Sequence, residues 1–153
     1  MASSNNLSSL SFMSVNVRGI NCKYKRHRIF ESLRCANSDV VFLQETFICT
    51  DNRKQECESD WSGQSVWHLS KDLQSKGVAV LFRPELTVKI LGTRGDSEGR
   101  FLIIDCEINN PTLDKTHKTY RLINVYFPNS PPQRASLVNI LTGLLTSNYV
   151  IVL

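Results

Sequence analysis

The sequence predicts an α/β fold, because apolar segments with strand patterns alternate along the chain with segments of helical periodicity. Its 153 residues, 41% hydrophobic and 21% charged, suit one globular domain. No apolar run approaches the ~18 residues that a membrane span needs, and residues 1–9 lack the pattern of a secretory signal. We therefore expect an intracellular protein, nuclear or cytoplasmic and not membrane-bound, with a disordered segment at 1–9 and one domain at 10–153.

Strand patterns occur throughout the chain. In residues 10–17 apolar and polar side chains alternate, as in a strand with one buried face, and Gly19 ends this pattern. Residues 39–43 form a continuous apolar run, which is typical of a strand covered on both faces. Further strands are expected at 65–69, 78–82, 86–91, 101–108, 120–126 and 149–153, with a Gly-rich turn at 92–99 and a loop from 109 to 117. No turn or cap follows the last pattern, so we expect a chain that is truncated on its C-terminal side.

Helical spacing of apolar residues predicts two helices. In residues 25–35, Ile29, Phe30 and Leu33 form one stripe, and the basic residues lie largely outside it. Residues 133–145 repeat this spacing with Leu137, Ile140, Leu141 and Leu144. The polar segment 50–60 is expected to be a helix or a loop.

The five cysteines are odd in number and contain no Cys-x-x-Cys pair. A structural zinc site needs closely paired thiolates or Cys/His pairs, and the sequence has none. Free thiols in a reducing compartment are therefore expected.

Basic residues are concentrated near the N-terminal end. Segment 16–35 holds six of them against one acidic residue, Glu31, although the net charge of the whole chain is only +4. Such a patch can attract phosphate backbones, and the alternative is a solvated helix face. The candidate nucleic-acid-binding residues are Arg18, Lys23, Lys25, Arg26 and Arg28.

Polar residues also follow three predicted strands, where layered α/β folds gather their sites. Glu45 comes directly after a buried strand, so its carboxylate needs a partner or a cation, unless it is an exposed residue at a loop start. A hard divalent ion binds through one or two carboxylates and leaves positions for phosphate oxygens. Asn16 could bind a ligand or cap a turn, Tyr126 could donate to a phosphate or pack, and Asn129 could be a turn residue.

Four segments occur in a definite order: Asn16–Gly19, Asp39–Thr46, Ser75–Leu81 and Asn124–Asn129. Together they resemble the endonuclease/exonuclease/phosphatase superfamily, and they are most similar to the apurinic/apyrimidinic-type endonucleases of non-LTR retrotransposons. The specific parts are Gln-Glu-Thr after an apolar strand and the Asn-Val-Tyr-x-Pro-Asn stretch, and the resemblance extends over nearly the whole chain.

The resemblance implies a four-layer α/β sandwich, the DNase I-like fold, with two sheets packed face to face and helices outside. It implies hydrolysis of a DNA phosphodiester by an activated water with Mg²⁺ or Mn²⁺. Glu45 would be a metal ligand, and Asn16 would lie beside it and help to hold the metal site. Tyr126 and Asn129 would contact the scissile phosphate or orient catalytic groups.

The sequence also departs from this family. Members continue after the last strand with Gly-Asp-Phe-Asn and later with Ser-Asp-His, and this chain contains neither. Its histidines, His27, His68 and His117, lie outside any matching motif. A DNA endonuclease fragment that is inactive by itself is therefore the first hypothesis. A non-catalytic nucleic-acid-binding remnant is the second, and a superfamily phosphatase or deadenylase with another phosphoester substrate is the third.

Overall fold

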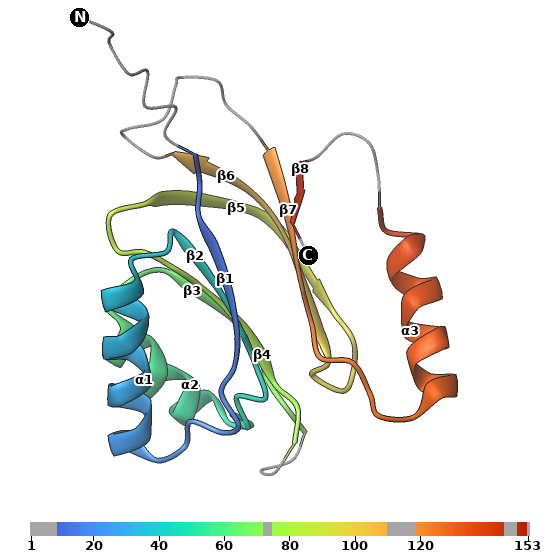
Figure 1. The fold of residues 1–153 in the computed structure, drawn as a ribbon, viewed down its shortest axis with the longest axis horizontal. Coiled ribbons are helices and arrows are strands. Elements are labelled where there is room, and N and C mark those ends of the chain that lie inside the picture. The colour runs from blue at the N-terminus through green and yellow to red at the C-terminus, as the bar shows by residue number, and fades with distance from the viewer. Residues whose placement is uncertain (1–8, 72–74, 110–118, 146–149, 153) are drawn as a thin grey trace, which may run out of the picture.

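The computed structural model describes residues 9–71, 75–109, 119–145 and 150–152. Two β-sheets lie face to face, α1 and α2 cover the outer face of one sheet, and α3 covers the other (Figure 1). This is the four-layer α/β sandwich that the sequence predicted. The elements are β1 Phe12–Asn16, α1 Lys23–Ala36, β2 Val40–Gln44, α2 Asp51–Trp61, β3 Ser65–His68, β4 Val78–Phe82, β5 Thr87–Gly95, β6 Phe101–Asn109, β7 Thr119–Val125, α3 Pro131–Thr142 and β8 Val150–Val152.

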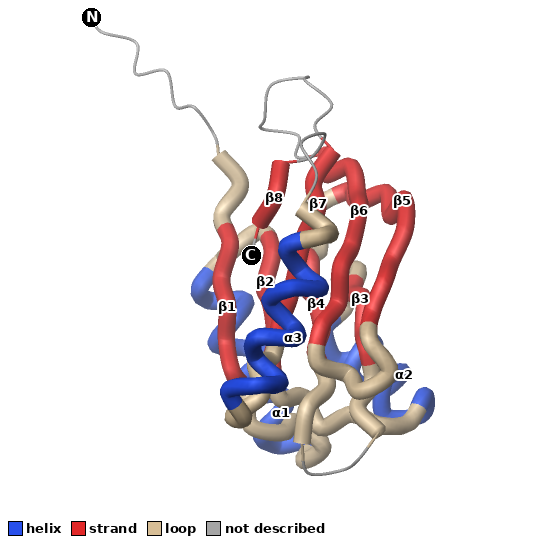
Figure 2. The backbone as a smooth tube through the Cα atoms, turned by 90° about the vertical axis from the view of Figure 1, so that its right-hand side faces the viewer, coloured by secondary structure: helices blue, strands red, loops and turns tan. Residues whose placement is uncertain are grey.

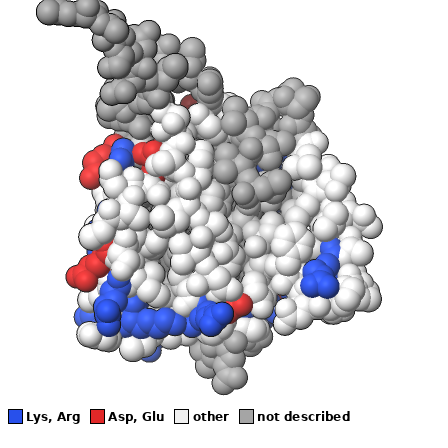
Figure 3. Space-filling view, viewed as in Figure 1, with Lys and Arg blue, Asp and Glu red and all other residues white. Residues whose placement is uncertain are grey.

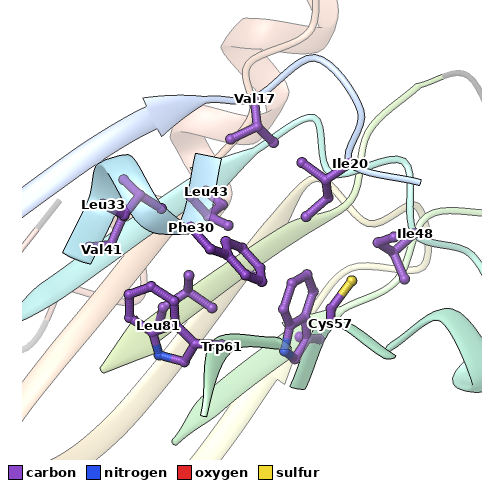
Figure 4. Close-up of a cluster of buried hydrophobic side chains, with 12 residues drawn as sticks. Val17, Ile20, Phe30, Leu33, Val41, Leu43, Ile48, Cys57, Trp61 and Leu81 are labelled. Carbon is purple, nitrogen blue, oxygen red and sulfur yellow. The ribbon is translucent and has the colours of Figure 1, made fainter. Parts of the chain in front are cut away.

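The first sheet has the strand order β1-β2-β4-β3, with β1 and β2 parallel and the other pairs antiparallel. Its outer face packs on α1 and α2 through a buried cluster (Figure 4). In this cluster Phe30 of α1 meets Trp61 of α2 edge to face, with ring centroids 5.5 Å apart. Burial of such apolar side chains is the main force that holds the helices on the sheet.

The second sheet has the order β5-β6-β7-β8, and β8 runs parallel to β7. Helix α3 packs on its outer face, where Leu137 and Leu141 contact a cluster that includes Ile103 and Ile123. A third cluster fills the space between the sheets with side chains from both, among them Phe42, Val80 and Ile104. Successive residues of a strand therefore pack alternately against the helices on the outer face and against the other sheet, because side chains alternate between the two faces of a strand.

One buried polar group joins the two sheets. Asn124 of β7 is 1% exposed. Its side-chain Nδ2 donates to the backbone carbonyl oxygens of Leu43 in β2 and Ala79 in β4, both at 2.8 Å. Gln44 Nε2 donates to Asn124 Oδ1 at 2.7 Å. The Asn124 amide is therefore satisfied across the core, and it sets how β7 lies against the first sheet.

Most predicted elements are present, with three differences. A Gly-rich turn was predicted at 92–99, but residues 92–95 continue strand β5 past a bulge between Ile90 and Gly92. The predicted start of the turn was therefore wrong. Helix α3 begins at Pro131, before the predicted start, because proline is favoured in the first helical turn. The segment left open at 50–60 is helix α2, whose N-cap Thr50 accepts a hydrogen bond from the Arg53 amide.

All five cysteines are free thiols, as expected. Burial raises the pKa of the Cys57 and Cys106 thiols to about 12, so these two are unreactive packing groups. The predictions for the first nine residues and for the loop through His117 fall almost wholly outside the described residues. Within the described part of the chain, no helix has the length and apolar character needed to cross a bilayer.

We predict that Asn124→Leu, which keeps the side-chain volume but removes the amide, lowers the free energy of unfolding. The carbonyl oxygens of Leu43 and Ala79 keep their bonds within the first sheet, but each would lose the additional hydrogen bond from Asn124. Each lost hydrogen bond contributes about 0.5–1.5 kcal/mol, so a loss of roughly 2 kcal/mol is expected in urea unfolding. Asn139→Ala on the exposed face of α3 is the control, with a change within about 0.5 kcal/mol. Equal effects of the two substitutions would contradict the role given to Asn124.

Candidate active site at the strand ends

The carboxyl ends of β1, β2 and β7 bring together three of the residues predicted from the sequence. Asn16 ends β1 beside Gln44 of the parallel strand β2, and Glu45 follows Gln44 directly. Tyr126 follows the last residue of β7. The Asn124 link to Leu43 lies two residues earlier on both β2 and β7, so the strand ends that carry Glu45 and Tyr126 face one another.

Backbone hydrogen bonds tie the loops around Glu45 together. The Gly19 amide donates to the Glu45 carbonyl at 2.7 Å, and the Thr46 amide donates to the Gly77 carbonyl at 2.9 Å. The Gly77 amide in turn donates to the Gly99 carbonyl at 2.9 Å. These bonds join four chain segments, which follow β1 and β2 and precede β4 and β6, in one network. The site therefore does not depend on a single flexible loop.

Left-handed backbone conformations are concentrated in this network. Arg18, Glu45, Phe47 and Lys76 have φ between 48° and 63°, although none is a glycine. Such conformations cost free energy and persist where the surrounding structure imposes them, which is frequent at functional sites. Gly77 has φ of 80°, and a Cβ there would lie 2.5 Å from Thr46 Oγ1, so this position needs glycine on both grounds.

Glu45 and Tyr126 interact through their side chains. Burial, together with the negative charge of Glu45 and hydrogen bonding to it, raises the pKa of Tyr126 above its ordinary value, while Arg100 and Lys76 act in the opposite direction. The Tyr126 hydroxyl therefore lies within the electrostatic reach of one carboxylate and two cations, and it is neutral at pH 7.

The two cations were not predicted as site residues. Lys76 Nζ pairs with Glu98 Oε2 at 2.7 Å. The backbone carbonyl of Arg100 accepts from the Tyr126 amide at 2.7 Å, which brings residue 100 to the end of β7. Both come from loops far away in sequence, and only the backbone network just described brings them to the site. Both cations act on the Tyr126 hydroxyl, and the Glu98 carboxylate offsets the charge of Lys76.

Asn16 and Asn129 are less closely engaged. Asn16 is exposed, and its Oδ1 accepts a hydrogen bond from the Arg18 amide at 3.1 Å, which fits the turn-capping alternative and leaves one lone pair for a ligand. Asn129 is exposed in the loop that leads from Tyr126 to α3. Within the described residues no hydrogen bond joins Asn129 to Glu45 or to Asn16, so its predicted role rests on the motif alone.

Metal binding at this place would involve few protein ligands. Among the described residues, no three His, Cys, Asp or Glu side chains gather as a metal site. The Glu45 carboxylate and the Asn16 amide oxygen are the oxygen donors at the ends of β1 and β2. This donor set fits part of the coordination of Mg²⁺ or Mn²⁺, which often have one or two protein carboxylates and otherwise water or phosphate oxygens.

Exposed basic side chains lie next to the site. Figure 3 shows Lys and Arg along the lower edge of the molecule, below α1 and the end of β1. Four of the five basic residues predicted to bind nucleic acid are exposed here or on the first turns of α1, namely Arg18, Lys23, Lys25 and Arg28. We call these four the basic surface. Lys25 Nζ also donates to the Arg18 carbonyl at 2.6 Å, which holds the turn after β1 against the helix.

Arg26 does not belong to this surface, so its inclusion among the nucleic-acid-binding residues was wrong. Its side chain is 1% exposed, and its Nε donates to Asp60 Oδ2 of α2 at 2.7 Å. Its Nη1 donates to the Ile20 carbonyl at 3.1 Å. Arg26 lies four residues before Phe30, on the buried stripe of α1, and this spacing was the signal that would have placed it inside.

Comparison with solved structures identifies the class of fold. An endonuclease/exonuclease/phosphatase family protein from Bacteroides thetaiotaomicron matches with a TM-score of 0.64 at 14% identity, over 90% of this chain and 58% of that one. The catalytic domain of APE2 from Xenopus laevis matches with a TM-score of 0.53 at 21% identity, over 85% and 49%. The AP endonuclease LMAP from Leishmania major matches with a TM-score of 0.56 at 20% identity, over 88% and 45%. These likenesses establish the DNase I-like fold of this superfamily, as predicted.

The sequence itself resembles a mobile-element protein. It is 27% identical over 137 residues to the transposon TX1 uncharacterized 149 kDa protein of Xenopus laevis, and the match covers 89% of this chain. This chain spans 10% of the length of that curated relative and about half the length of the structures above. No family model matches the chain.

We predict that Glu45→Gln lowers the pKa of Tyr126, because the substitution removes the negative charge that disfavours the phenolate. NMR titration of the tyrosine ring carbon Cζ measures this pKa directly. Glu85→Gln, at an exposed carboxylate that pairs with Arg83, is the charge-matched control and should leave Tyr126 unchanged. An identical Tyr126 titration in wild type and Glu45→Gln would show that the two side chains do not touch.

Arg26→Leu should destabilise the fold by about 3 kcal/mol, the lower end of the range for breaking a buried ion pair, because Asp60 remains partly in water. Arg28→Leu, two residues later and exposed, is the control and should change stability within about 0.5 kcal/mol. Burial favours a higher pKa for Asp60, but hydrogen bonds from Arg26 and His27 outweigh it and hold the pKa below 3.8. The stabilisation is thus present above pH 3.8 and is lost as the pH falls further, so the difference between wild type and Arg26→Leu should narrow in acid.

Proposed function

We propose that this chain contributes Glu45 and its neighbouring site residues to a divalent-metal phosphodiesterase site that acts on DNA. The complete site would belong to a longer polypeptide that includes this chain. The observation that supports this most strongly is the position of Glu45 and Tyr126, each two residues after the hydrogen bond between Leu43 and Asn124 at facing strand ends, in a fold shared with endonucleases and phosphatases. A carboxylate and a neutral phenol, held in strained loops beside two cations, form an arrangement that core packing does not require.

The proposed roles follow from the chemistry of each group. Glu45 and Asn16 would hold Mg²⁺ or Mn²⁺, which when bound polarises a phosphoryl oxygen and lowers the pKa of a bound water. Tyr126 would donate a hydrogen bond from its hydroxyl to a phosphate oxygen, and its raised pKa keeps this hydroxyl protonated. Asn129 would orient the same phosphate as a neutral donor. Lys76 and Arg100 add positive charge near Tyr126, which would favour a phosphate there.

The basic surface supports DNA as the substrate among the phosphoesters that this fold accommodates. Arg18 lies two residues after the end of β1 and Lys23 begins α1, so a DNA backbone that crosses the site would continue over α1. The similarity to a transposon protein points in the same direction. A fold alone does not define a substrate, since similar structures include an AP endonuclease and a mannosyl-6-phosphatase. The other candidates, a non-catalytic nucleic-acid-binding protein and a hydrolase of another phosphoester, differ in the outcomes of the two tests below.

We expect the 153-residue chain by itself not to nick supercoiled plasmid with Mg²⁺. The two histidines that the structure describes are engaged elsewhere, His27 with Asp60 and His68 with Asp96. Glu45 is a single carboxylate, and phosphodiester hydrolysis also needs general acid and base groups. Loss of one preorganised group typically costs ~10²–10³ in rate. A longer polypeptide that includes this chain should nick, and Glu45→Ala should abolish that activity whereas Glu85→Ala should not. Robust nicking by the chain that is insensitive to Glu45→Ala would contradict the proposed site.

DNA binding should be weak and independent of sequence, with a Kd of roughly 10⁻⁴ to 10⁻⁶ M. The affinity should fall steeply as the salt concentration increases. The double variant Lys23→Ser, Arg28→Ser should bind DNA less tightly. In a plot of log K against the logarithm of the salt concentration, the slope should be shallower by about one for each phosphate that is no longer neutralised. Fluorescence anisotropy with a labelled duplex at several salt concentrations measures both quantities.

The control is the double variant Lys89→Ser, Arg94→Ser, which removes two positive charges from strand β5, outside the basic surface. Affinity that does not change with salt, or equal losses in the two double variants, would exclude the basic surface as the place where DNA binds. Binding that follows the prediction, together with an inactive longer polypeptide, would favour the non-catalytic alternative.

A further inference from the structure

His68, the last residue of β3, joins the first sheet to the second. Strand β3 lies beside β4 at the end of the first sheet, and in Figure 2 it is on the same side of the molecule as β5 and β6, away from β1. The Nε2 atom of His68 lies 2.6 Å from the backbone carbonyl oxygen of Asp96, in the turn between β5 and β6. A carbonyl oxygen can only accept, so Nε2 carries a proton and donates it in this hydrogen bond.

The turn at residues 96–100 has internal hydrogen bonds that close it. Asp96 Oδ1 accepts from the Arg100 amide at 2.8 Å and from the Phe101 amide at 3.4 Å. These bonds give the turn its shape, as is common for aspartate at the start of a turn. They do not attach it to the first sheet, whereas the bond from His68 to the Asp96 carbonyl does.

Two glycines allow the turn to lie directly against the chain around His68. A Cβ at Gly95 would lie 2.5 Å from His68 Cε1, so the imidazole ring rests on the Gly95 backbone. A Cβ at Gly99 would lie 2.5 Å from the carbonyl oxygen of Leu69. A side chain at either position would separate the turn from β3.

The same turn reaches the candidate active site through its other end. The Gly99 carbonyl accepts from the Gly77 amide, and the Arg100 carbonyl accepts from the Tyr126 amide. The Nε atom of Arg100 is buried and has no hydrogen-bond partner among the described residues. The position of the turn backbone therefore decides where the Arg100 guanidinium lies relative to Tyr126.

Glu98, in the middle of the turn, also holds a cation of the site. Its carboxylate lies 2.7 Å from Lys76 Nζ and 3.4 Å from Lys71 Nζ. Hydrogen bonds from Lys76 and Lys71, together with their charges, hold the pKa of Glu98 below its ordinary value. The Glu98 side chain is 41% exposed, and exposed ion pairs contribute little to stability. The His68 side chain is 27% exposed, so its hydrogen bond is the better shielded tie between the turn and the first sheet.

We propose that His68 is a positioning residue of the candidate active site, because its hydrogen bond to the Asp96 carbonyl places the turn 96–100 beside Tyr126. The turn then fixes the charges of Arg100 and Lys76 at the site. His68 itself takes no part in the chemistry, so another side chain that donates from the same place should replace it. The inference rests on the proposed function only in assigning Tyr126 to the site.

Two substitutions separate the hydrogen bond of His68 from its bulk. His68→Leu has a side chain of similar size without a donor, whereas His68→Gln retains an N–H at about the reach of Nε2. In His68→Leu the Arg100 and Gly77 amides should exchange with solvent roughly tenfold faster, because a hydrogen bond that holds the turn is lost. In His68→Gln these amides should exchange as in wild type.

NMR signals at the site distinguish positioning from general stability. In His68→Leu the pKa of Glu98 should rise toward its ordinary value, since the pairing with Lys76 is loosened. The ring signals of Tyr126 should shift, because the two cations near it move. Amides of β2 and β4 report unfolding of the core and should exchange as in wild type.

A glycine substitution gives a second test that leaves His68 in place. Gly95→Ala puts a Cβ against the imidazole ring, so the ring must move from Asp96, and the turn should respond as in His68→Leu. Gly92→Ala on the same strand is the matched control, because no atom of the described residues lies within 4 Å of a Cβ there.

Three results would overturn the proposal. They are Tyr126 ring signals that are unchanged in His68→Leu, a His68→Gln variant that behaves like His68→Leu, and equal behaviour of Gly95→Ala and Gly92→Ala. None of these measurements involves a metal ion, DNA or a substitution of Glu45. Failure of the nicking test would therefore remove the proposed function and leave the role of His68 standing, and the reverse outcome is equally distinguishable.

Discussion

The amide of Asn124 is the constraint on which the site depends. It is buried, and it donates to carbonyls of β2 and β4 across the core, so the second sheet cannot slide on the first without leaving the Asn124 amide unpaired in the core. Hydrophobic packing between the sheets is stronger in total but has no preferred direction. The hydrogen bonds of Asn124 therefore select one register from the many that the apolar interface would permit.

This register has a direct consequence for chemistry. Leu43 and Asn124 each lie two residues before a candidate catalytic side chain, so the bond between them brings Glu45 and Tyr126 together. The backbone network around Glu45 then fixes the loops, at the cost of several left-handed residues. Both arrangements rely on backbone and buried groups, which leaves the Glu45 carboxylate available for a ligand.

Much of this organisation could be predicted from the sequence, and the remainder shows what local patterns lack. Strands and helices follow from apolar spacing, and the site at the strand ends follows from the position of Glu45 and Tyr126 after apolar runs. Arg26 was misplaced because a charged residue on a helix is usually exposed, and its partner Asp60 lies 34 residues away. Lys76 was missed for a similar reason, since only the pairing of distant loops brings it to Tyr126. The bulge in β5 converts an apparent turn into strand, and glycines alone do not reveal it.

If Glu45 holds a divalent metal where the two sheets meet, crystals of the chain soaked in Mn²⁺ will reveal the ion by its anomalous scattering. A peak is expected about 2 Å from a Glu45 carboxylate oxygen, beside Asn16, and it should disappear in Glu45→Gln. A Mn²⁺ ion bound elsewhere, or a peak that persists unchanged in Glu45→Gln, would contradict it.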